Sequence, residues 1–266
     1  MTILVTGATG NIGRLVVDAL LAAGATDVRA LTVDPVRAAL PASVEAFRGY
    51  VGRPASIGPA LEGVHALYLA PTPHTAGEVV GLAREAGVER IVDLSGEEGS
   101  WWYAVAEAVE ASGAEWTHLM PGDFMANISV WADTIRETGT VRDAAFGSAS
   151  APIALEDVAA VAATALLHDG HAGRAYSLTG PETITRERQA RLIGEALGRE
   201  LRLVELTREE AIAELHDLGE YAEWFVDGLL ELVDTPAEAT STVEEVLGRP
   251  GTPFSTWVRD NVEMFR

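Results

Sequence analysis

The chain has 266 residues, of which 48% are hydrophobic, so it is long enough for one large α/β domain with an added lobe. Its formal charge of −21 disfavours nucleic acids and anionic lipid surfaces as partners, and the absence of cysteine excludes disulfides, thiolate metal sites and cysteine nucleophiles. No apolar run reaches the roughly 18–20 residues that span a bilayer, and no basic leader with a cleavage site precedes the first strand, so we expect a soluble cytoplasmic protein.

Short apolar strands alternate with amphipathic helices through the first half of the chain. The predicted strands are Thr2–Thr6, Asp27–Val33, Glu45–Phe47, Ala66–Ala70, Arg90–Leu94 and Trp116–Met120. The predicted helices between them are Arg14–Ala23, Ala55–Leu61, His74–Ala86 and Tyr103–Ala111. Short apolar strands of this kind are buried on both faces, and right-handed crossovers place them in a parallel, doubly wound sheet, the Rossmann fold.

The alternation becomes looser after Gly122. One further strand is predicted at Ala175–Leu178, and the remaining segments have a helical pattern: Phe124–Glu137, Leu155–His168, Arg186–Leu197, Arg208–Leu218, Tyr221–Val233, Thr242–Leu247 and Ser255–Met264. These segments are too few for a second full domain. We therefore predict a sheet domain over residues 1–155, which includes the segment 124–137. Residues 156–266 are predicted to hold the last helix and strand of that sheet and a small, mostly helical lobe over the carboxyl ends of the strands.

A glycine-rich turn joins the first predicted strand to the first predicted helix. Its GxxGxxG spacing lets Gly7 make the tight turn, Gly10 approach a pyrophosphate and Gly13 pack the helix against the strand. The helix N-terminus then presents free N–H groups to the phosphates, and Thr9 and Asn11 add hydrogen bonds. Further predicted contacts lie in this turn or at strand ends: Ala8, Ile12, Thr32, Ala70, Pro71, Ser95 and Pro121. The domain 1–155 is thus predicted to bind a nicotinamide dinucleotide.

The residues after the second predicted strand bear on the choice between NAD and NADP. Asp34 can accept a hydrogen bond from the ribose 2′-hydroxyl of NAD, at about the spacing from the glycines that such a residue has. Arg37 can pair with the 2′-phosphate of NADP, or lie as a solvated helix residue. The carboxylate favours NAD, and NADP stays the alternative.

Short motifs along nearly the whole chain resemble the NmrA-like branch of the atypical short-chain dehydrogenase/reductase family. They lie at Leu4–Gly10, Val28–Leu31, Ala60–Val64, Ala83–Val88, Glu110–Gly113, Pro121–Asn127, Asp157–Ala162 and Leu178–Glu182. The resemblance implies a Rossmann domain with a small C-terminal lobe. It also implies one of two roles: an NAD(P)H-dependent reductase of quinones and enones, with some relatives acting on aromatic polyketides, or a redox sensor without catalysis.

Three positions depart from the pattern of that family. Val33 stands where an arginine often contacts the phosphate of NADP, which supports NAD or weak discrimination. Gly49–Val51 replaces a loop that commonly carries an acid near the adenine, and Met120 replaces the arginine of an Arg-Pro pair. The resemblance therefore implies a retained scaffold with an altered pocket.

All basic residues in the chain are arginines, so no lysine can serve in a tyrosine–lysine proton relay. The catalytic residue stays unknown, with Tyr103 and Ser95 as candidates, and Tyr103 can equally be a residue packed beside the cofactor. A quinone or vinylogous ketone suits such a site because its reduced form is a phenolate-like anion with a conjugate-acid pKa of about 10. Water or a hydroxyl group can then supply the proton.

Aromatic and apolar residues follow the fifth and sixth predicted strands, at the edge where open α/β sheets bind ligands. The predicted substrate contacts are Trp101, Trp102, Tyr103, Phe124, Met125, Asn127 and Trp131, together with Trp224 in the lobe. The alternative is that these residues form core between the sheet and the lobe. The histidines show no metal-binding spacing, and we interpret them as structural or surface residues.

These observations predict an NAD(P)H-dependent oxidoreductase that acts on a quinone or a polycyclic aromatic ketone, without a metal. The lysine-free composition, the aromatic residues and the resemblance favour aromatic polyketide tailoring in antibiotic biosynthesis, where a reduced quinone reacts with oxygen and is hydroxylated, as in a monooxygenase reaction. The alternatives are an NAD(P)-binding sensor with a protein partner and an isomerase or epimerase that uses the cofactor transiently. A small planar aromatic substrate is the expected partner, with homodimer formation as a further option.

Overall fold

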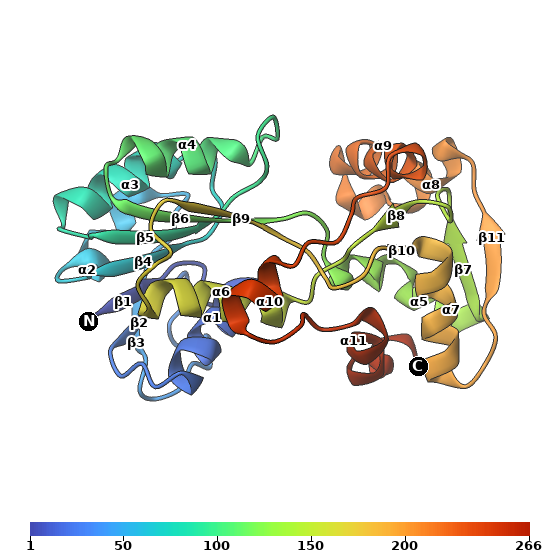
Figure 1. Cartoon of the computed structure of the whole chain (residues 1–266), viewed down its shortest axis with the longest axis horizontal. Coiled ribbons are helices and arrows are strands. Elements are labelled where there is room, and N and C mark those ends of the chain that lie inside the picture. The colour runs from blue at the N-terminus through green and yellow to red at the C-terminus, as the bar shows by residue number, and fades with distance from the viewer. The chain divides into compact units, whose positions relative to one another are not determined.

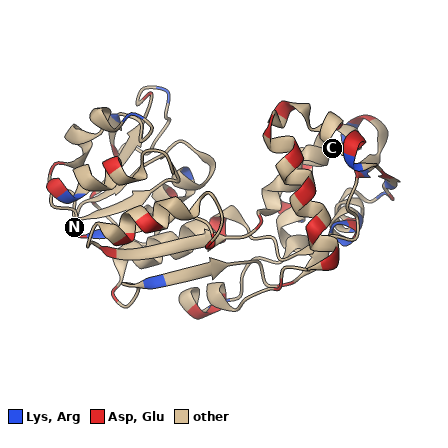
Figure 2. Cartoon of the chain, turned by 90° about the horizontal axis from the view of Figure 1, so that it is seen from above, with Lys and Arg blue, Asp and Glu red and all other residues tan.

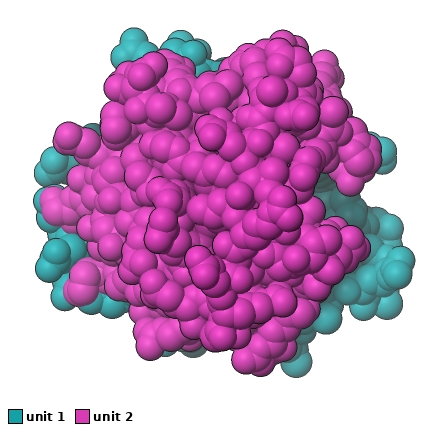
Figure 3. Space-filling model, turned by 90° about the vertical axis from the view of Figure 1, so that its right-hand side faces the viewer, with its two compact units in different colours: residues 1–122, 155–178, 242–249 teal, residues 123–154, 179–241, 250–266 magenta.

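The structure, a computed structural model, describes residues 1–266. The chain forms two compact units, each built from three segments, which are coloured teal and magenta in Figure 3. Unit 1 comprises Met1–Gly122, Leu155–Leu178 and Thr242–Arg249, and unit 2 comprises Asp123–Ala154, Thr179–Ser241 and Pro250–Arg266. Each unit therefore draws on segments that are far apart in the sequence.

Unit 1 contains a seven-stranded parallel sheet with the strand order β3-β2-β1-β4-β5-β6-β9. The strands are β1 (Ile3–Val5), β2 (Val28–Thr32), β3 (Glu45–Arg48), β4 (Ala66–Leu69), β5 (Arg90–Leu94), β6 (Glu115–Pro121) and β9 (Arg174–Leu178). The order reverses at β1, so the carboxyl ends of β1 and β4 border the crevice at which α/β sheets of this kind bind ligands. This sheet confirms the predicted fold class.

Helices cover both faces of this sheet, as Figure 1 shows for α3 and α4 on one face and α1 and α6 on the other. They are α1 (Asn11–Ala22), α2 (Gly58–Leu61), α3 (Ala76–Glu85), α4 (Tyr103–Ala111), α6 (Leu155–Leu167) and α10 (Thr242–Leu247), with a 3-10 turn η1 at Pro54–Ser56. Strands β1 and β4 are buried at every position because both faces of the sheet are covered.

Unit 2 has short elements and two small sheets. Its strands are β7 (Thr140–Asp143) paired with β11 (Arg202–Glu205), and β8 (Ala149–Ser150) paired with β10 (Ile184–Thr185). Its helices are α5 (Ala132–Thr138), α7 (Arg186–Leu197), α8 (Arg208–Glu214), α9 (Tyr221–Asp234) and α11 (Phe254–Asp260), with 3-10 segments η2 (Met125–Trp131), η3 (His216–Leu218) and η4 (Val262–Phe265). The lobe is thus mainly helical, but its four strands were not predicted.

Three predicted helices of unit 2 differ from the structure. The segment predicted as one helix over Phe124–Glu137 is η2 followed by α5, the segment Arg208–Leu218 is α8 followed by η3, and the segment Ser255–Met264 is α11 followed by η4. The first segment changes from 3-10 to α-helical geometry after Trp131, whose buried side chain donates a hydrogen bond to Asp143. No helix of the structure combines the length and the apolar character needed to cross a membrane.

Acidic residues are distributed over the helices of both units, with arginines scattered among them (Figure 2). The excess of acidic over basic residues agrees with the net charge of −21.

Candidate functional site

The glycine turn between β1 and α1 has the geometry that its sequence predicts. Gly7 has a φ of +59°, a conformation that residues with a side chain rarely adopt. A Cβ atom added at Gly13 would overlap the carbonyl group of Gly7, so only glycine lets α1 begin this close to the turn. A Cβ at Gly10 would lie 3.2 Å from the Gly7 oxygen. The turn is therefore built from glycines that let backbone lie against backbone.

The N-terminus of α1 is left without a side-chain cap. Gly10 is the N-cap residue, has extended φ and ψ angles, and offers no side chain to the first N–H groups of the helix. Asn11 is exposed and Ile12 is half-buried in this first turn. An uncapped N-terminus behind a glycine turn presents N–H donors and a partial positive charge, which fits a pyrophosphate group.

Threonine side chains hold the turn against the neighbouring strands. The Thr6 hydroxyl donates to the Tyr68 carbonyl at 3.0 Å and accepts from the Ala70 N–H group at 2.8 Å, which ties the end of β1 to the end of β4. The hydroxyls of Thr9 and Thr32 lie 3.2 Å apart, so the turn also contacts the end of β2. Sequence reasoning missed Thr6, although it directly precedes the first glycine.

Acidic and basic side chains meet after β2 and β3. The Asp34 carboxylate accepts from the N–H groups of Val36 and Arg37 at 3.2 and 3.4 Å, which keeps it at the end of β2. The Arg48 guanidinium lies 3.9 Å from the same carboxylate, while Arg37 is exposed. Arg48 was not predicted, because only the pairing of β2 with β3 brings it beside Asp34.

Three aromatic rings form an exposed cluster on the loops that follow β4 and β5. The rings of His74 and Trp101 have centroids 5.1 Å apart, and those of Trp101 and Trp102 are 4.6 Å apart. Trp101 is 46% exposed and Trp102 is 36% exposed, which is unusual for large apolar side chains. His74 was interpreted as a structural or surface residue, and the structure adds it to this cluster.

Ser95 and Tyr103 flank the loop that carries the two tryptophans. Ser95 directly follows β5 and is 6% exposed, and Tyr103 begins α4. Partial desolvation and the charges of Glu110, Glu98 and Glu107 raise the pKa of Tyr103, which makes its hydroxyl a weaker acid than that of a free tyrosine.

The other predicted site residues of unit 1 lie at strand ends. Pro71 follows β4 and is half-buried, as is Pro121 at the end of β6, and Ala8 is fully buried inside the glycine turn. Together with the turn they mark the carboxyl edge of the sheet.

The predicted substrate residues of unit 2 divide into buried and accessible side chains. Met125 and Trp131 are 1% and 2% exposed in the core, where the Trp131 Nε1–H donates to Asp143 at 3.0 Å. Phe124 is half-buried, and Trp224 on α9 is 68% exposed. Their role toward a substrate stays a prediction.

Asn127 belongs to a small polar cluster within unit 2. Its side-chain amide donates to Asp123 at 2.8 Å, and the Ser150 hydroxyl donates to the other oxygen of the same carboxylate at 2.7 Å. Asp123 was not predicted, although it stands in the quoted segment Pro121–Asn127.

A cavity of about 630 Å³ lies within unit 2, between η2 and the helices α8 and α9. Apolar side chains form much of its wall: Val130, Trp131, Leu206, Leu215, Leu218, Phe225, Val226 and Leu229. The chain holds no group of three or more histidine, aspartate or glutamate side chains placed to bind a metal ion.

Comparison with known proteins agrees with this geometry. Residues 7–169 match the model of a family described as NAD(P)H-binding. The chain belongs to this family. Membership confirms the resemblance to the NmrA-like branch of the atypical short-chain dehydrogenases, and it shows that the cofactor is an NAD(P)H dinucleotide.

Three relatives indicate the activities found in the family. A (4-alkanoyl-5-oxo-2,5-dihydrofuran-3-yl)methyl phosphate reductase from Streptomyces griseus is 38% identical over 99% of both chains. An NAD(P)H azoreductase from Xenophilus azovorans is 32% identical over 99% of both chains. The crystal structure of an NADPH-dependent quinone oxidoreductase from Escherichia coli superposes with a TM-score of 0.86 at 25% identity, over 98% of this chain and 99% of that one. The chain is therefore a member of an NAD(P)H-dependent reductase family.

Proposed function

We propose that this protein reduces a quinone or a polycyclic aromatic ketone with NADH in preference to NADPH. The observation that carries the proposal is the exposed cluster of Trp101, Trp102 and His74 on the same edge of the sheet as the glycine turn. Exposed indole faces stack on planar aromatic rings, and a site at the carboxyl edge of the strands lies where such folds bind ligands. The cluster would orient a flat acceptor by stacking rather than by charge.

The glycine turn and the first turn of α1 would hold the pyrophosphate, with Thr9 and Thr32 beside it. The bound dinucleotide supplies a hydride. The protein would then hold the nicotinamide ring and the acceptor face to face and exclude water, since the cofactor supplies the redox chemistry. The chain has no lysine and so no tyrosine–lysine relay, which suits an acceptor whose reduced form is a stable phenolate-like anion.

The named substrates of the relatives support a conjugated acceptor. They are a dihydrofuranone phosphate, azo compounds and quinones. The exposed cluster of this chain is aromatic, and the net charge of −21 disfavours a phosphorylated substrate.

Oxidation of NADH, followed by the absorbance of the reduced nicotinamide, tests the proposal. The acceptor panel contains a naphthoquinone, an anthraquinone, an azo dye and a simple aliphatic ketone. We expect turnover with the quinones and little with the aliphatic ketone, whose alkoxide product needs a stronger acid. Trp101→Ala should raise the KM for the quinone several-fold and leave the KM for NADH unchanged. Tight dinucleotide binding by calorimetry without turnover of any acceptor would favour the alternative, a non-catalytic NAD(P) sensor.

The preference for NADH rests on Asp34, whose carboxylate would accept a hydrogen bond from the ribose 2′-hydroxyl and repel a 2′-phosphate. Asp34→Asn should lower the ratio of kcat/KM for NADH to that for NADPH about tenfold, because a charged acceptor is lost. Arg37→Gln is the matched control, since it alters the competing phosphate contact. If Arg37→Gln lowers the rate with NADPH and Asp34→Asn has no effect, the preferred cofactor is NADPH instead of NADH.

We further propose that the reduced quinone reacts with oxygen, which would place the protein in the tailoring of aromatic polyketides. Turnover with NADH and a polycyclic quinone should then consume oxygen and yield a hydroxylated product. Oxygen uptake without hydroxylation, or no uptake, would leave the reductase activity and remove this extension.

A further inference from the structure

Two ionisable side chains pair inside the central sheet of unit 1. Asp93 in β5 lies opposite His118 in β6 in the strand register, and both are at most 1% exposed. The Asp93 Oδ2 atom is 2.6 Å from the His118 Nδ1 atom. The indole of Trp116 stacks on the imidazole, with ring centroids 4.2 Å apart. Strands at the centre of such a sheet are ordinarily apolar, so this pair needs an explanation.

The pair is poorly satisfied as a structural element. Asp93 Oδ1 and the buried Ser95 Oγ form no hydrogen bond, and His118 Nε2 has only a 3.4 Å ion-pair contact with the Glu110 carboxylate. Buried polar atoms without partners destabilise the folded state, and native proteins keep few of them. Two such atoms beside a weakly partnered imidazole nitrogen suggest that the groups are retained for their chemistry.

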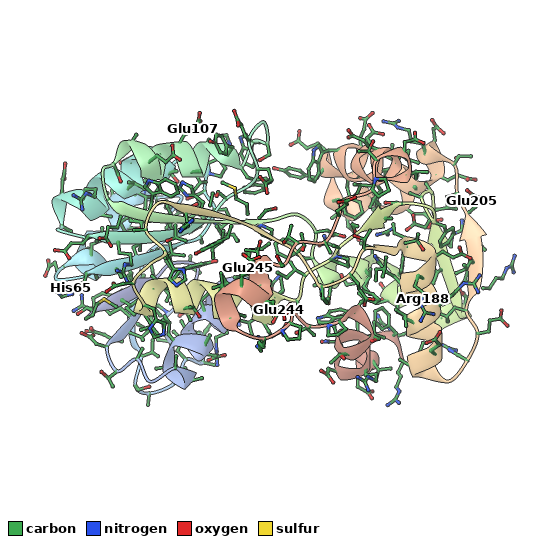
Figure 4. All side chains as sticks on the ribbon, viewed as in Figure 1. His65, Glu107, Arg188, Glu205, Glu244 and Glu245 are labelled. Carbon is green, nitrogen blue, oxygen red and sulfur yellow. The ribbon has the colours of Figure 1, made fainter.

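The outer end of this cluster reaches solvent through α4. Glu110 on that helix places Oε1 3.4 Å from His118 Nε2, and its side chain is 44% exposed. Glu107 lies one turn earlier on the same helix and is exposed on its outer side, as Figure 4 shows. Glu110 is therefore the carboxylate of α4 that connects the buried imidazole with water.

The inner end of the cluster reaches the carboxyl edge of the sheet. Ser95 follows Asp93 by two positions, so both side chains leave the strand on the same face. The Ser95 hydroxyl is near enough to lower the pKa of Asp93. In the proposed path, the Ser95 hydroxyl exchanges a proton with the Asp93 carboxylate. Ser95 stands at the end of β5, directly before the loop that carries Trp101 and Trp102.

The surroundings raise the pKa of both members of the Asp93–His118 pair. Burial raises the pKa of Asp93, against the contacts with His118 and Ser95 that lower it. Burial lowers the pKa of His118, but the contacts with Asp93 and Glu110 outweigh it and raise the pKa overall. Burial, together with the charge of Asp93, raises the pKa of the Tyr68 hydroxyl in β4. Tyr68 therefore stays neutral and does not compete for the proton.

We propose that Glu110, His118, Asp93 and Ser95 form a proton path from solvent to the site, which supplies the proton that completes the reduction. The path rests on the proposed reductase function. It would replace the tyrosine–lysine relay, because the chain has no lysine and the hydroxyl of Tyr103 is a weakened acid. Ser95 is the catalytic residue of this path, and the other three act through it.

The transfers balance as follows. The acceptor receives a hydride from the reduced dinucleotide at one atom and a proton at its oxygen. The Ser95 O–H bond breaks as the new O–H bond of the product forms, and Ser95 regains a proton from Asp93. Asp93 receives a proton from His118 Nδ1, and His118 Nε2 is reprotonated from solvent by way of Glu110. The net change in the protein is zero, and one solvent proton is consumed for each dinucleotide oxidised.

Steady-state kinetics of the full chain with NADH and 2-methyl-1,4-naphthoquinone test this path, with the solvent deuterium isotope effect and the pH profile of kcat as readouts. Ser95→Ala and Asp93→Asn should lower kcat by about 10²-fold, the usual contribution of a positioned acid, with the KM for NADH unchanged. Glu110→Gln should lower kcat about tenfold, increase the isotope effect and respond to added imidazole buffer, which can reprotonate His118. Glu107→Gln is the matched control and should behave as the wild type.

The outcomes separate this path from the proposed function. If the wild type turns over and Ser95→Ala and Glu110→Gln have the same kcat, pH profile and isotope effect as the wild type, the proton path is wrong and the reductase function stands. No turnover by the wild type with any acceptor would overturn both. Asp93→Asn removes a buried charge and can impair folding. Glu110→Gln changes an exposed side chain, so it tests the path without this effect, and its melting temperature shows whether the variant is folded like the wild type.

Discussion

Two buried carboxylates, Asp93 in unit 1 and Asp143 in unit 2, have opposite surroundings. Asp143 is saturated: its Oδ2 accepts from Trp131 at 3.0 Å and from Arg186 Nε and Nη2 at 3.0 and 2.6 Å, while Oδ1 accepts from the Ala145 N–H group at 2.8 Å. Asp93 has one hydrogen-bond partner, His118, and leaves Oδ1 free. A carboxylate with both oxygens hydrogen-bonded holds a fold together, whereas one with a free oxygen keeps the capacity to exchange a proton.

Particular helix N-termini of the two units differ in a similar way. In unit 2, Thr185 caps α7 and Thr207 caps α8, the latter in a reciprocal capping box with Glu210. In unit 1, Gly10 leaves the N-terminus of α1 uncapped. The first N–H groups of α7 and α8 are therefore partly satisfied by side chains, whereas those of α1 are not.

Replacement of Asp143, the carboxylate with both oxygens hydrogen-bonded, should have the largest effect on stability. Asp143→Ala leaves the Arg186 guanidinium buried at 4% exposure over the Trp131 ring without its counter-charge. We expect the free energy of unfolding to fall by about 3–5 kcal/mol, measured by urea denaturation. Asp133→Ala breaks the exposed pair with Arg136 and should cost less than about 1 kcal/mol. Equal losses in the two variants would remove the contrast between the units.

Obstruction of the glycine turn should abolish ligand binding in unit 1. Gly13→Val places a side chain against the Gly7 carbonyl group, so we expect dinucleotide affinity to fall more than about 10²-fold by calorimetry, or more than about 2.7 kcal/mol. Gly81→Ala on α3 is the control, since a Cβ there meets open space. That variant should bind normally and gain up to about 1 kcal/mol in stability. Normal binding by Gly13→Val would contradict the assignment of the turn.

The Asp93–His118 pair should make stability depend on pH. Both groups have raised pKa values in the folded protein, so the folded state binds more protons than the unfolded state, and stability falls as pH rises. The contribution of His118 is complete below its ordinary pKa of 6.5 and is lost as pH rises through the raised value, and that of Asp93 declines from its ordinary 3.8 upward. Each proton contributes a slope of at most about 1.4 kcal/mol per pH unit.

Urea denaturation over a pH series measures this slope in the wild type and in Asp93→Asn. The variant should have a flatter profile because one titrating group is removed. An identical slope in both proteins would mean that other groups cause the dependence.

The smallest expected effect is the loss of a cap in unit 2. Thr207→Ala removes the acceptor for the Glu210 N–H group and should cost about 1 kcal/mol in the free energy of unfolding, with dinucleotide affinity unchanged. Thr207→Ser keeps the hydroxyl and should be near neutral. A change in affinity in the alanine variant would show that unit 2 contributes to cofactor binding.

The period of hydrophobic residues and the glycine spacing were sufficient to predict the strands of unit 1 and the turn at Gly7–Gly13. Each of these signals is local: a buried strand shows itself in four or five consecutive residues, as β4 does. The strands of unit 2 gave no such signal, because β7 acquires its partner β11 from about sixty residues further along the chain. Two-residue strands such as β8 have no period at all.

Sequence alone therefore determined the fold class, the glycine turn and the absence of lysine, since these depend on residue type and short-range order. Only the tertiary structure decided which side chains meet: the register of β5 with β6 sets Asp93 beside His118, the pairing of β2 with β3 brings Arg48 to Asp34, and loop packing assembles His74 with the two tryptophans. Strand register and loop packing depend on the packing of the whole core. The residues next to a polar side chain in the sequence therefore do not reveal its partners in the structure.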